Sequence, residues 1–392
     1  MRKTLSCCIV VRNEAKFIGI CLEHITVLAD QVVIIDTGST DGTVKAIHGW
    51  MADYAARKKI NPAAMGKWII IEEVGKRFHD SDGDFDFGSA KTYAFSKSTK
   101  DYVMWLDARD LVQEQIIVKR KFLEFAEKKE CIFTMPTLMS GKHSFNRLRI
   151  GPRSKCTVIG RIHEYMWVKD LTGISRVQIN VPIKNDKPSR DLSRNLRLLR
   201  KEWDREPTSR LAFYLGNTYH GMQDFAEAIV WFRKRVYSFD YSDEHQEEYY
   251  KSLECIAECT LKIYKTKTEV PVLLDDVYDV SNEMIRREPL RVEGYYYLGM
   301  YHIEKREFKE AMEALRKHTT CRIPKDVKLW LDPAIYGGNL LTRAIEMCKT
   351  AEKYEDVIIP KPEQIMDYNP GYQSSYSRGD QQYSRNPNQT IF

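Results

Sequence analysis

The sequence predicts two folded domains of different class. An α/β domain with a mostly parallel central sheet spans residues 1–185, and an all-α domain of helical repeats spans residues 189–355. Two observations lead to this division. Short apolar runs alternate with helical patterns up to residue 110, which is typical of a parallel sheet with helices on both faces. Beyond residue 189 the pattern is almost wholly helical and partly repeats.

Four short apolar runs rich in β-branched residues predict the strands of the parallel sheet. They are LSCCIVV (5–11), QVVIID (31–36), KWIIIEEV (67–74) and the run from Tyr102 to Leu106. Helical periodicity is found between them, at 14–30, 44–59 and 88–99. The segment TGSTDGT (37–43) is rich in turn-forming and helix-capping residues, so we expect a turn there.

The α/β domain continues beyond the fourth strand. A helix is expected at about 113–129, and strand-like runs follow up to residue 185. We expect these runs to form antiparallel strands that are added to the sheet or folded over its edge. The runs are CIFTMPTL, FNRLRIG, TVIGRIHEYMWV and ISRVQINVPI.

The helical domain contains an internal repeat. FYLGNTYHGMQDFAEAIVWF (213–232) aligns with YYLGMYHIEKREFKEAMEAL (296–315) at an offset of 83 residues. In each copy an Ala lies 12 residues after the Gly, and a bulky apolar residue lies 16 after it. This is the tetratricopeptide pattern, in which small residues let two helices approach closely. The segment 249–264 lies halfway between the copies, so the repeat length is roughly 41 rather than 34 residues. A generic helical bundle is the alternative.

Composition limits the class of protein. A net charge of +6 spread over 392 residues is too weak to indicate nucleic-acid binding. No apolar stretch reaches the roughly 18 residues of a membrane span, and the N-terminal apolar run is too short for a signal peptide. We therefore expect a cytoplasmic protein with nine reduced cysteines. Cys255 and Cys259, one helical turn apart, are expected to pack in a core rather than bind a metal.

Residues 357–392 differ from the rest of the chain. They are rich in Pro, Ser, Gln and Tyr and contain few aliphatic residues. Such a segment cannot bury enough apolar surface to fold alone. We expect a low-complexity tail that is disordered or folds on a partner.

Polar side chains gather where the predicted strands end. Arg12-Asn13-Glu14 follow the first strand, Asp36 ends the second, and Asp107-Ala108-Arg109-Asp110 follow the fourth. Ligands of parallel α/β sheets bind beyond the carboxyl ends of the strands, so these side chains are expected to share one site. Charges at the end of a buried strand are costly unless they are paired, hydrated or bound to a ligand.

Four segments together carry a resemblance to a known family. CIVVRNEAKFI, VVIIDTGSTDGT, DFGSAKTYAFSKSTKDYVMWLDARD and GRIHEYM occur in this order. Over about residues 3–170 the chain resembles the family 2 glycosyltransferases with the GT-A fold. It is most similar to bacterial members with C-terminal tetratricopeptide-like helices, including the peptide S-glycosyltransferases of bacteriocin clusters. The resemblance implies transfer of a sugar from a nucleotide diphosphosugar, with a UDP-sugar favoured, and inversion at the anomeric carbon.

The resemblance implies a donor site at the strand ends. Asp36 can accept a hydrogen bond from a pyrimidine N–H, and Arg12 and Glu14 can flank the base and the ribose. Ser39 and Asp41 offer oxygens that fix the turn after the second strand. Helix capping alone is the alternative for these two residues.

The fourth strand departs from the family motif Asp-x-Asp. Asp107 matches the first acid, but Arg109 stands where the second acid usually holds a divalent cation. Three accounts remain open. Asp107, Asp110 and His163 hold Mn²⁺ or Mg²⁺; or Arg109 replaces the cation, because a guanidinium pairs bidentately with phosphate oxygens; or the site is degenerate and only binds. Lys91, where related sequences commonly have an arginine, is expected to contact the diphosphate.

The segment GRIHEYM (160–166) offers the remaining catalytic group. Glu164 is the candidate general base that takes the acceptor proton during direct displacement, and it joins Asp107 and Arg109 in the predicted catalytic set. Adjacent residues of a regular strand point to opposite faces. A bend or bulge is therefore needed to present both His163 and Glu164, and a surface His-Glu pair is the alternative.

The sequence leaves the acceptor open. Helical repeats usually present a groove for a peptide or protein, which favours a protein acceptor, and they also offer a surface for self-association. The basic segment 184–205 can instead meet nucleic acid or another polyanion such as a polysaccharide, or form a solvated amphipathic helix. The acidic run HDSDGDFDFG (79–88) lacks the residue order of a calcium loop, so we expect an exposed loop that leads into the site.

A scaffold is the rival function. In that account the helical repeats bind a peptide and the α/β domain is an inactive enzyme. Arg109 favours the scaffold, whereas Asp36, Asp107, His163 and Glu164 together favour the enzyme.

Overall fold

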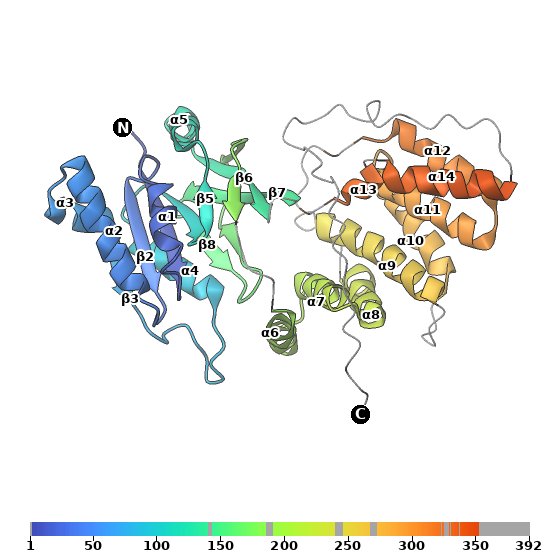
Figure 1. Cartoon of the computed structure of the whole chain (residues 1–392), viewed down its shortest axis with the longest axis horizontal. Coiled ribbons are helices and arrows are strands. Elements are labelled where there is room, and N and C mark those ends of the chain that lie inside the picture. Colours follow the sequence, from blue (N-terminus) through green and yellow to red (C-terminus); the bar gives the residue numbers. More distant parts are fainter. Residues whose placement is uncertain are drawn as a thin grey trace, which may run out of the picture.

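The computed structural model confirms the predicted fold class, an α/β domain followed by helical repeats (Figure 1). It describes residues 2–139, 143–185, 191–239, 246–266 and 273–352, the last range without 323, 325–328, 330 and 337. The predicted tail, 357–392, lies outside the described residues. In the described part of the chain, no helix is long and apolar enough to cross a membrane.

Four parallel strands form one half of the main sheet. Their order is β3 (Ile69–Glu73), β2 (Gln31–Asp36), β1 (Leu5–Val11) and β4 (Tyr102–Asp107). Val11 pairs with Asp36, and Val10 pairs with Asp107. The carboxyl ends of the three inner strands therefore lie side by side at one edge, as the sequence predicts.

The other half of the sheet is mixed in direction. β7 runs antiparallel to β4 and β6 antiparallel to β7, as expected, but β10 and β11 run parallel to β6. A short strand that the sequence analysis missed, β5, pairs with β11. The bounds are β5 (Asp110–Val112), β6 (Cys131–Met139), β7 (His143–Pro152), β10 (Ser175–Gln178) and β11 (Ile183–Asn185).

The run TVIGRIHEYMWV, expected as one strand, forms two. β8 (Cys156–Ile159) and β9 (Tyr165–Val168) pair antiparallel in a sheet of their own. The chain bends between them because Gly160 and His163 both have positive φ angles, of 97° and 54°. This is the bend that the sequence analysis required for presenting both His163 and Glu164.

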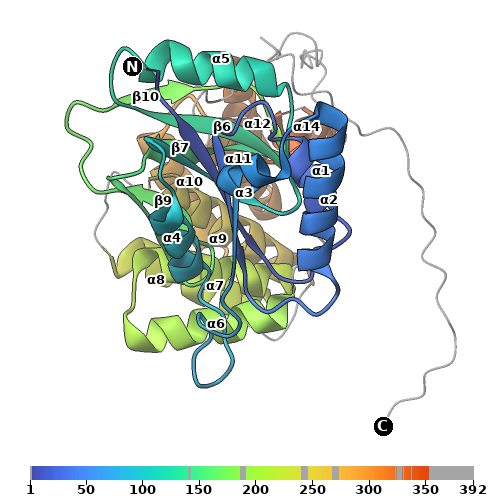
Figure 2. The same ribbon diagram turned by 90° about the vertical axis from the view of Figure 1, so that its left-hand side faces the viewer.

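Helices cover both faces of the main sheet (Figure 2). α4 (Phe87–Lys97) packs its Ala94 and Phe95 with Trp105 of β4 on one face, and the other helices of this domain bury apolar side chains on the other face. The latter are α1 (Ile18–Glu23), α2 (Thr43–Lys58), α3 (Pro62–Trp68) and α5 (Gln115–Ala126). α1 is much shorter than the expected helix 14–30. Three consecutive β-branched residues, 25–27, follow its end, and such residues disfavour helix.

The helical part begins with α6 and continues as antiparallel helix pairs. Cys255 and Cys259 are buried in its apolar core, as expected. The bounds are α6 (Leu192–Arg205), α7 (Ser209–Gly221), α8 (Phe225–Tyr237), α9 (Gln246–Thr266), α10 (Asp275–Arg287), α11 (Val292–Lys305), α12 (Phe308–Arg316), α13 (Pro333–Tyr336) and α14 (Asn339–Glu352). A 3-10 turn, Lys317–Thr320, follows α12.

The repeat spacing corresponds to close helix contacts. A Cβ added to Gly216 in α7 would lie 2.7 Å from the ring of Phe232 in α8. In the second copy, a Cβ added to Gly299 in α11 would lie 2.6 Å from the side chain of Leu315 in α12. The glycines thus let the paired helices touch, which is the physical basis of the tetratricopeptide pattern.

Gly216→Ala should therefore destabilise the protein by about 1–3 kcal/mol, because the new methyl group overpacks the contact with Phe232. Gly49→Ala in α2 is the matched control. Nothing lies within 4 Å of its new Cβ, so it should stabilise by roughly 0.5–1 kcal/mol through helix propensity. Urea denaturation of both variants measures the two values. If the two variants changed the free energy of unfolding equally and with the same sign, the close contact between α7 and α8 at Gly216 would be contradicted.

Candidate active site

The loops after β1 and β2 are fastened to each other. The Asn13 N–H donates to Ser39 Oγ at 2.9 Å, and the Ala15 N–H donates to Asp41 Oδ2 at 3.1 Å. Asp41 also accepts from the Thr43 N–H at 3.0 Å. Ser39 and Asp41 thus hold the two loops in register, which is a loop-fixing role.

Asp36 has one carboxylate oxygen in use and one buried without a donor. Its Oδ1 accepts from the N–H groups of Gly38 and Ser39, both at 2.9 Å. Its Oδ2 is buried, and no described residue donates to it. An unpaired buried oxygen is costly, so a ligand N–H that reached it would gain a strong hydrogen bond.

Lys91 of α4 joins Asp107 and Glu164. Its Nζ lies 2.9 Å from Asp107 Oδ1 and 2.6 Å from Glu164 Oε1. The ammonium is buried and lies 4.0 Å from the centroid of the Trp105 ring. Burial opposes the charged form, but the two carboxylates outweigh it and raise the pKa of Lys91. The end of β4, the helix α4 and the bend after β8 thus meet at one cation.

The close packing of α4 against the bend sets this geometry. Gly88, in the first turn of α4, lies so close to the chain that an added Cβ would be 2.6 Å from the carbonyl oxygen of Gly160. α4 can therefore approach the bend closely enough for Lys91 to reach Glu164, which lies four residues after Gly160.

Arg109 and Arg12 each have a neighbour in the site. Arg109 Nε donates to Glu14 Oε2 at 2.9 Å, and its guanidinium carbon lies 4.2 Å from the centroid of the Phe17 ring. Arg12 Nη1 lies 2.7 Å from His79 Nε2. Glu14 is therefore bound to Arg109 rather than standing alone beside a base or ribose.

The three predicted metal ligands do not form a cluster. Asp110 is fully buried; its Oδ2 accepts from Arg149 Nη1 and from the Asp107 N–H, each at 2.9 Å, and its Oδ1 accepts from Asn185. Both of its oxygens are thus engaged in holding β4, β7 and β11 together. This arrangement does not fit a role as metal ligand, and the physical reason is that β5 turns the side chain into the domain interior.

His163 faces the helical part. Its ring stacks on Tyr214 of α7, with centroids 3.9 Å apart and planes 5° apart. Its carbonyl oxygen accepts from Arg210 Nη2 at 3.2 Å, and Arg210 forms an ion pair with Glu248 of α9. The bend therefore presents Glu164 to Lys91 and His163 to the first repeat helix.

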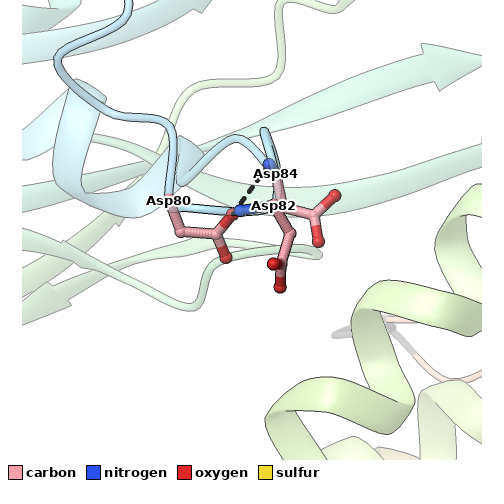
Figure 3. A group of neighbouring side chains, drawn as sticks. All are labelled: Asp80, Asp82 and Asp84. Carbon is pink, nitrogen blue, oxygen red and sulfur yellow. Dashed lines mark hydrogen bonds between the residues drawn. The ribbon is translucent and has the colours of Figure 1, made fainter.

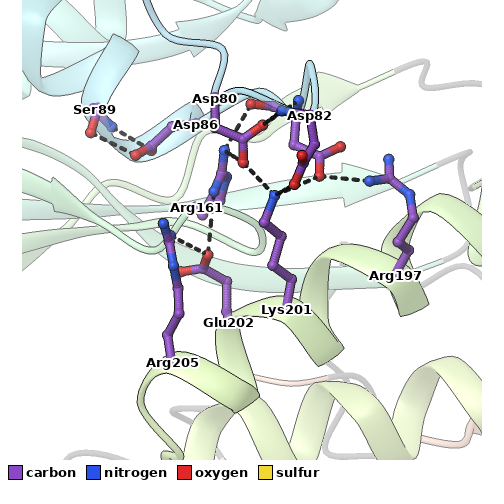
Figure 4. Close-up of polar contacts among 10 residues, drawn as sticks. Asp80, Asp82, Asp86, Ser89, Arg161, Arg197, Lys201, Glu202 and Arg205 are labelled. Atoms are coloured by element: carbon purple, nitrogen blue, oxygen red, sulfur yellow. Dashed lines mark hydrogen bonds and ion pairs between the residues drawn. The ribbon is translucent and has the colours of Figure 1, made fainter.

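A different group of acids comes together near the second domain. Asp80, Asp82 and Asp84 place one oxygen each within 4.8 Å of one another (Figure 3). Lys201 of α6 forms ion pairs with all three, at 2.6 Å to Asp80 (Figure 4). Arg197 of α6 lies 2.6 Å from Asp84. Protein cations therefore already neutralise this cluster.

These ion pairs change two sequence-based interpretations. The acidic loop packs against α6 and against Arg161, whose Nη2 lies 2.7 Å from Asp80. Of the basic segment, the part within α6 meets this acidic loop of the same chain, so nothing requires an external polyanion. The Lys201 ammonium is the largest cause of the lowered pKa of Asp80.

Sequence reasoning missed four residues around the site. Arg147 and Arg149 of β7 both lie beside Trp105, and Arg210 and Tyr214 of α7 contact the bend. The signal for the first two was two arginines at alternating positions of a strand-like run, FNRLRIG. No pattern linked α7 to the α/β domain, because that contact joins segments about 50 residues apart.

A comparison with protein families decides the class of the α/β domain. The model of Glycosyl transferase family 2 matches residues 6–176. This part of the chain is a family 2 glycosyltransferase domain. The match includes the ends of β1, β2 and β4 and the bend with Glu164. Family 2 enzymes commonly use a divalent cation.

The other comparisons found similarity to proteins of known sequence or structure. A TPR repeat-containing protein of Synechococcus elongatus is 35% identical over 77 residues, 17% of this chain, and the chain spans only 19% of that relative. TarS 1–349 of S. aureus has 11% identity and a TM-score of 0.33, covering 72% of this chain and 91% of its own. Glucosyl-3-phosphoglycerate synthase of Mycobacterium tuberculosis has 14% identity and a TM-score of 0.31, covering 52% and 80%.

Proposed function

We propose that this protein transfers a sugar from a nucleotide diphosphosugar, with a UDP-sugar favoured, to a protein or peptide acceptor with inversion. The observation that carries the proposal is the position of Asp36, Asp107, Lys91 and Glu164 at the carboxyl edge of a family 2 domain. Ligands of parallel sheets bind at this edge. Asp36 supplies an acceptor for the base, and Glu164 supplies a base for the acceptor proton.

Inversion follows because the scheme uses one direct displacement at the anomeric carbon. Glu164 takes the proton from the acceptor nucleophile while that nucleophile displaces the nucleoside diphosphate from the anomeric carbon. The hydrogen bond from Lys91 Nζ holds the Glu164 carboxylate in one orientation. A covalent sugar intermediate is not needed in this scheme.

The position of α7 favours a protein or peptide acceptor. The acceptor must approach Glu164, and both neighbours of Glu164 contact α7: His163 stacks on Tyr214, and Tyr165 lies under the Arg210 guanidinium at 4.6 Å. An acceptor that reaches Glu164 therefore passes the first repeat helix. Repeats of this kind bind extended segments of other proteins.

The proposal also concerns which positive charges face the diphosphate. Asp110 does not fit a divalent cation because both of its oxygens are bonded, and Arg109 takes the place of the second acid. Asp107 is bonded to Lys91. We therefore favour fixed protein cations over Mn²⁺ or Mg²⁺ as the charges opposite the diphosphate.

The scaffold remains the second candidate. Arg109 is occupied by Glu14, which favours a degenerate site. In that account the protein binds a peptide on its repeats and turns over no donor. A donor that is bound but never consumed would support it.

Asp36→Asn should weaken the binding of UDP roughly 10- to 100-fold, because the change replaces the buried acceptor oxygen by an N–H donor that repels a base N–H. The turn is expected to survive, since the amide oxygen can still accept from Gly38 and Ser39. Thermal-shift titration of wild type and variant measures the change. Asp53→Asn, in the middle of α2, is the control. Equal UDP affinity in wild type and Asp36→Asn would contradict the role of Asp36.

A further inference from the structure

Arg147 of β7 lies next to the proposed donor site. β7 runs antiparallel to β4, with Met104 opposite Ile150, so the chain of β7 returns along β4 toward Asp107. The guanidinium carbon of Arg147 lies 5.8 Å from the Trp105 ring centroid and 4.7 Å from the Phe145 ring centroid. Trp105 is the same ring on which Lys91 lies.

Arg147 differs from the other buried and half-buried cations of the site in having no anion; Arg12, which lies beside His79, is exposed. Each of the other four is paired: Lys91 with Asp107 and Glu164, Arg109 with Glu14, Arg149 with Asp110, and Arg210 with Glu248. Within the described part of the chain, no residue accepts a hydrogen bond from Arg147 or forms an ion pair with it. Its guanidinium rests only on aromatic rings.

A half-buried guanidinium without an anion is unfavourable. Burial first and the neighbouring charge of Arg149 second lower the pKa of Arg147, while Glu164, Tyr214 and Asp107 act in the opposite direction. Glu164 and Asp107 are therefore close enough to affect Arg147, but both already share Lys91. The site thus has a half-buried positive charge that no described anion compensates, beside the residues that would hold the donor.

We propose that Arg147 binds the diphosphate of the nucleotide sugar and carries charge that a divalent cation carries in other family 2 enzymes. The inference rests on the proposed function and deepens it. A guanidinium offers a planar set of donors that matches two phosphate oxygens, and it is always charged. As the bond to the sugar breaks, the leaving diphosphate gains negative charge, and a fixed cation stabilises it without reorganisation.

If Arg147 faces the diphosphate, Asp110 is not needed as a metal ligand and can have a structural role. Arg149, two residues beyond Arg147 on the same strand, neutralises Asp110 in the interior. The two arginines of β7 thus have different roles. Arg149 connects β7 to Asp110 after β4, and Arg147 would bind an external anion.

The test measures the affinities of UDP, inorganic pyrophosphate and uridine for the full chain, in buffer containing EDTA. Calorimetry serves for the tight ligands, and ligand-detected NMR serves for the weak ones. The variants are Arg147→Gln, Arg147→Lys and the control Arg176→Ala, an exposed arginine of β10. Melting temperatures establish that each variant is folded.

Arg147→Gln should bind UDP and pyrophosphate on the order of 10- to 100-fold more weakly than wild type, with uridine unchanged. The affinity of Arg147→Lys for UDP and pyrophosphate should lie between those of wild type and Arg147→Gln, because lysine keeps the charge but lacks the planar set of donors. Arg176→Ala should match wild type for every probe. A loss confined to ligands with phosphate distinguishes anion binding from a structural role.

Three results would overturn the proposal. The first is full affinity of Arg147→Gln for UDP, the second is an equal loss of affinity for uridine and UDP in that variant, and the third is binding of UDP to wild type only after Mn²⁺ is added. In each case UDP still binds wild type, so the proposed function stands while the role of Arg147 fails. If wild type binds neither UDP nor a panel of other nucleoside diphosphates under any condition, both proposals fail together.

Discussion

Glu164→Gln should lower turnover of the donor by roughly 100- to 10,000-fold, because it removes the general base. The amide oxygen can still accept from Lys91 Nζ, so the pocket keeps its shape and UDP binding should change little. Rates of nucleoside diphosphate release and calorimetric UDP affinity measure the two effects separately.

Glu124→Gln is the matched control for this change. Glu124 lies on α5 and forms only an exposed ion pair with Lys121 at 3.3 Å, so its loss should leave turnover unaffected. A Glu164→Gln variant that keeps wild-type turnover would remove Glu164 from the mechanism.

Lys91→Met should destabilise the protein by roughly 3 kcal/mol, because it leaves two carboxylates facing each other without their cation. This is the low end of the range for a broken buried pair, since Asp107 and Glu164 keep 19% and 14% of their side-chain surface exposed. Turnover should fall as well, because Glu164 loses its orientation.

Two further variants make this prediction specific. Lys97→Met, on the same helix but in a partly exposed pair with Glu72, should cost at most about 1 kcal/mol. The double variant Lys91→Met/Glu164→Gln should lose less free energy of unfolding than the two single variants together, because it removes the repulsion between the Asp107 and Glu164 carboxylates. Urea denaturation of wild type, Lys91→Met, Glu164→Gln, the double variant and Lys97→Met measures these effects. Strict additivity would contradict a direct interaction between Lys91 and Glu164.

The pH dependence of the Lys91 contribution has a definite sign. The folded-state pKa lies above the ordinary value of 10.5. The stabilisation is therefore fully present below that value and is lost only as the pH rises through the folded-state pKa. Around neutral pH, titration of Lys91 should therefore not change the difference in free energy of unfolding between wild type and Lys91→Met.

Much of the fold follows from local patterns in the sequence. The apolar runs of β1, β2 and β4 are buried strands whatever surrounds them, and their order with helices between them implies parallel pairing. Gly216 and Gly299 indicate helix pairs because only the smallest residue fits the contact. The strand ends then bring Asp36 and Asp107 to one edge, which locates the candidate site.

The direction of individual side chains could not be predicted in this way. Asp110 follows Asp107 by three residues, but the pairing of β5 with β11 turns it toward Asn185, which is 75 residues away. Arg147 reaches the site only because β7 returns along β4. Both depend on long-range strand register, which a local pattern does not contain.

The same limit applies to contacts between the two domains. The acidic loop and the basic helix α6 were each visible in the sequence, and their charges are complementary. Their pairing through Lys201 depends on how the chain returns after β11. Likewise, the stacking of His163 on Tyr214 assigns the histidine to the domain contact, a role that no spacing rule suggested.

The most direct test of the account is donor turnover by the purified full chain. A panel of UDP- and GDP-sugars is incubated with wild type and Glu164→Gln, with EDTA or with Mn²⁺, and the released nucleoside diphosphate is measured. The account predicts that wild type consumes at least one donor in the presence of EDTA and that Glu164→Gln does not. If folded wild type released no nucleoside diphosphate from any donor under either condition, glycosyl transfer by this site would be contradicted.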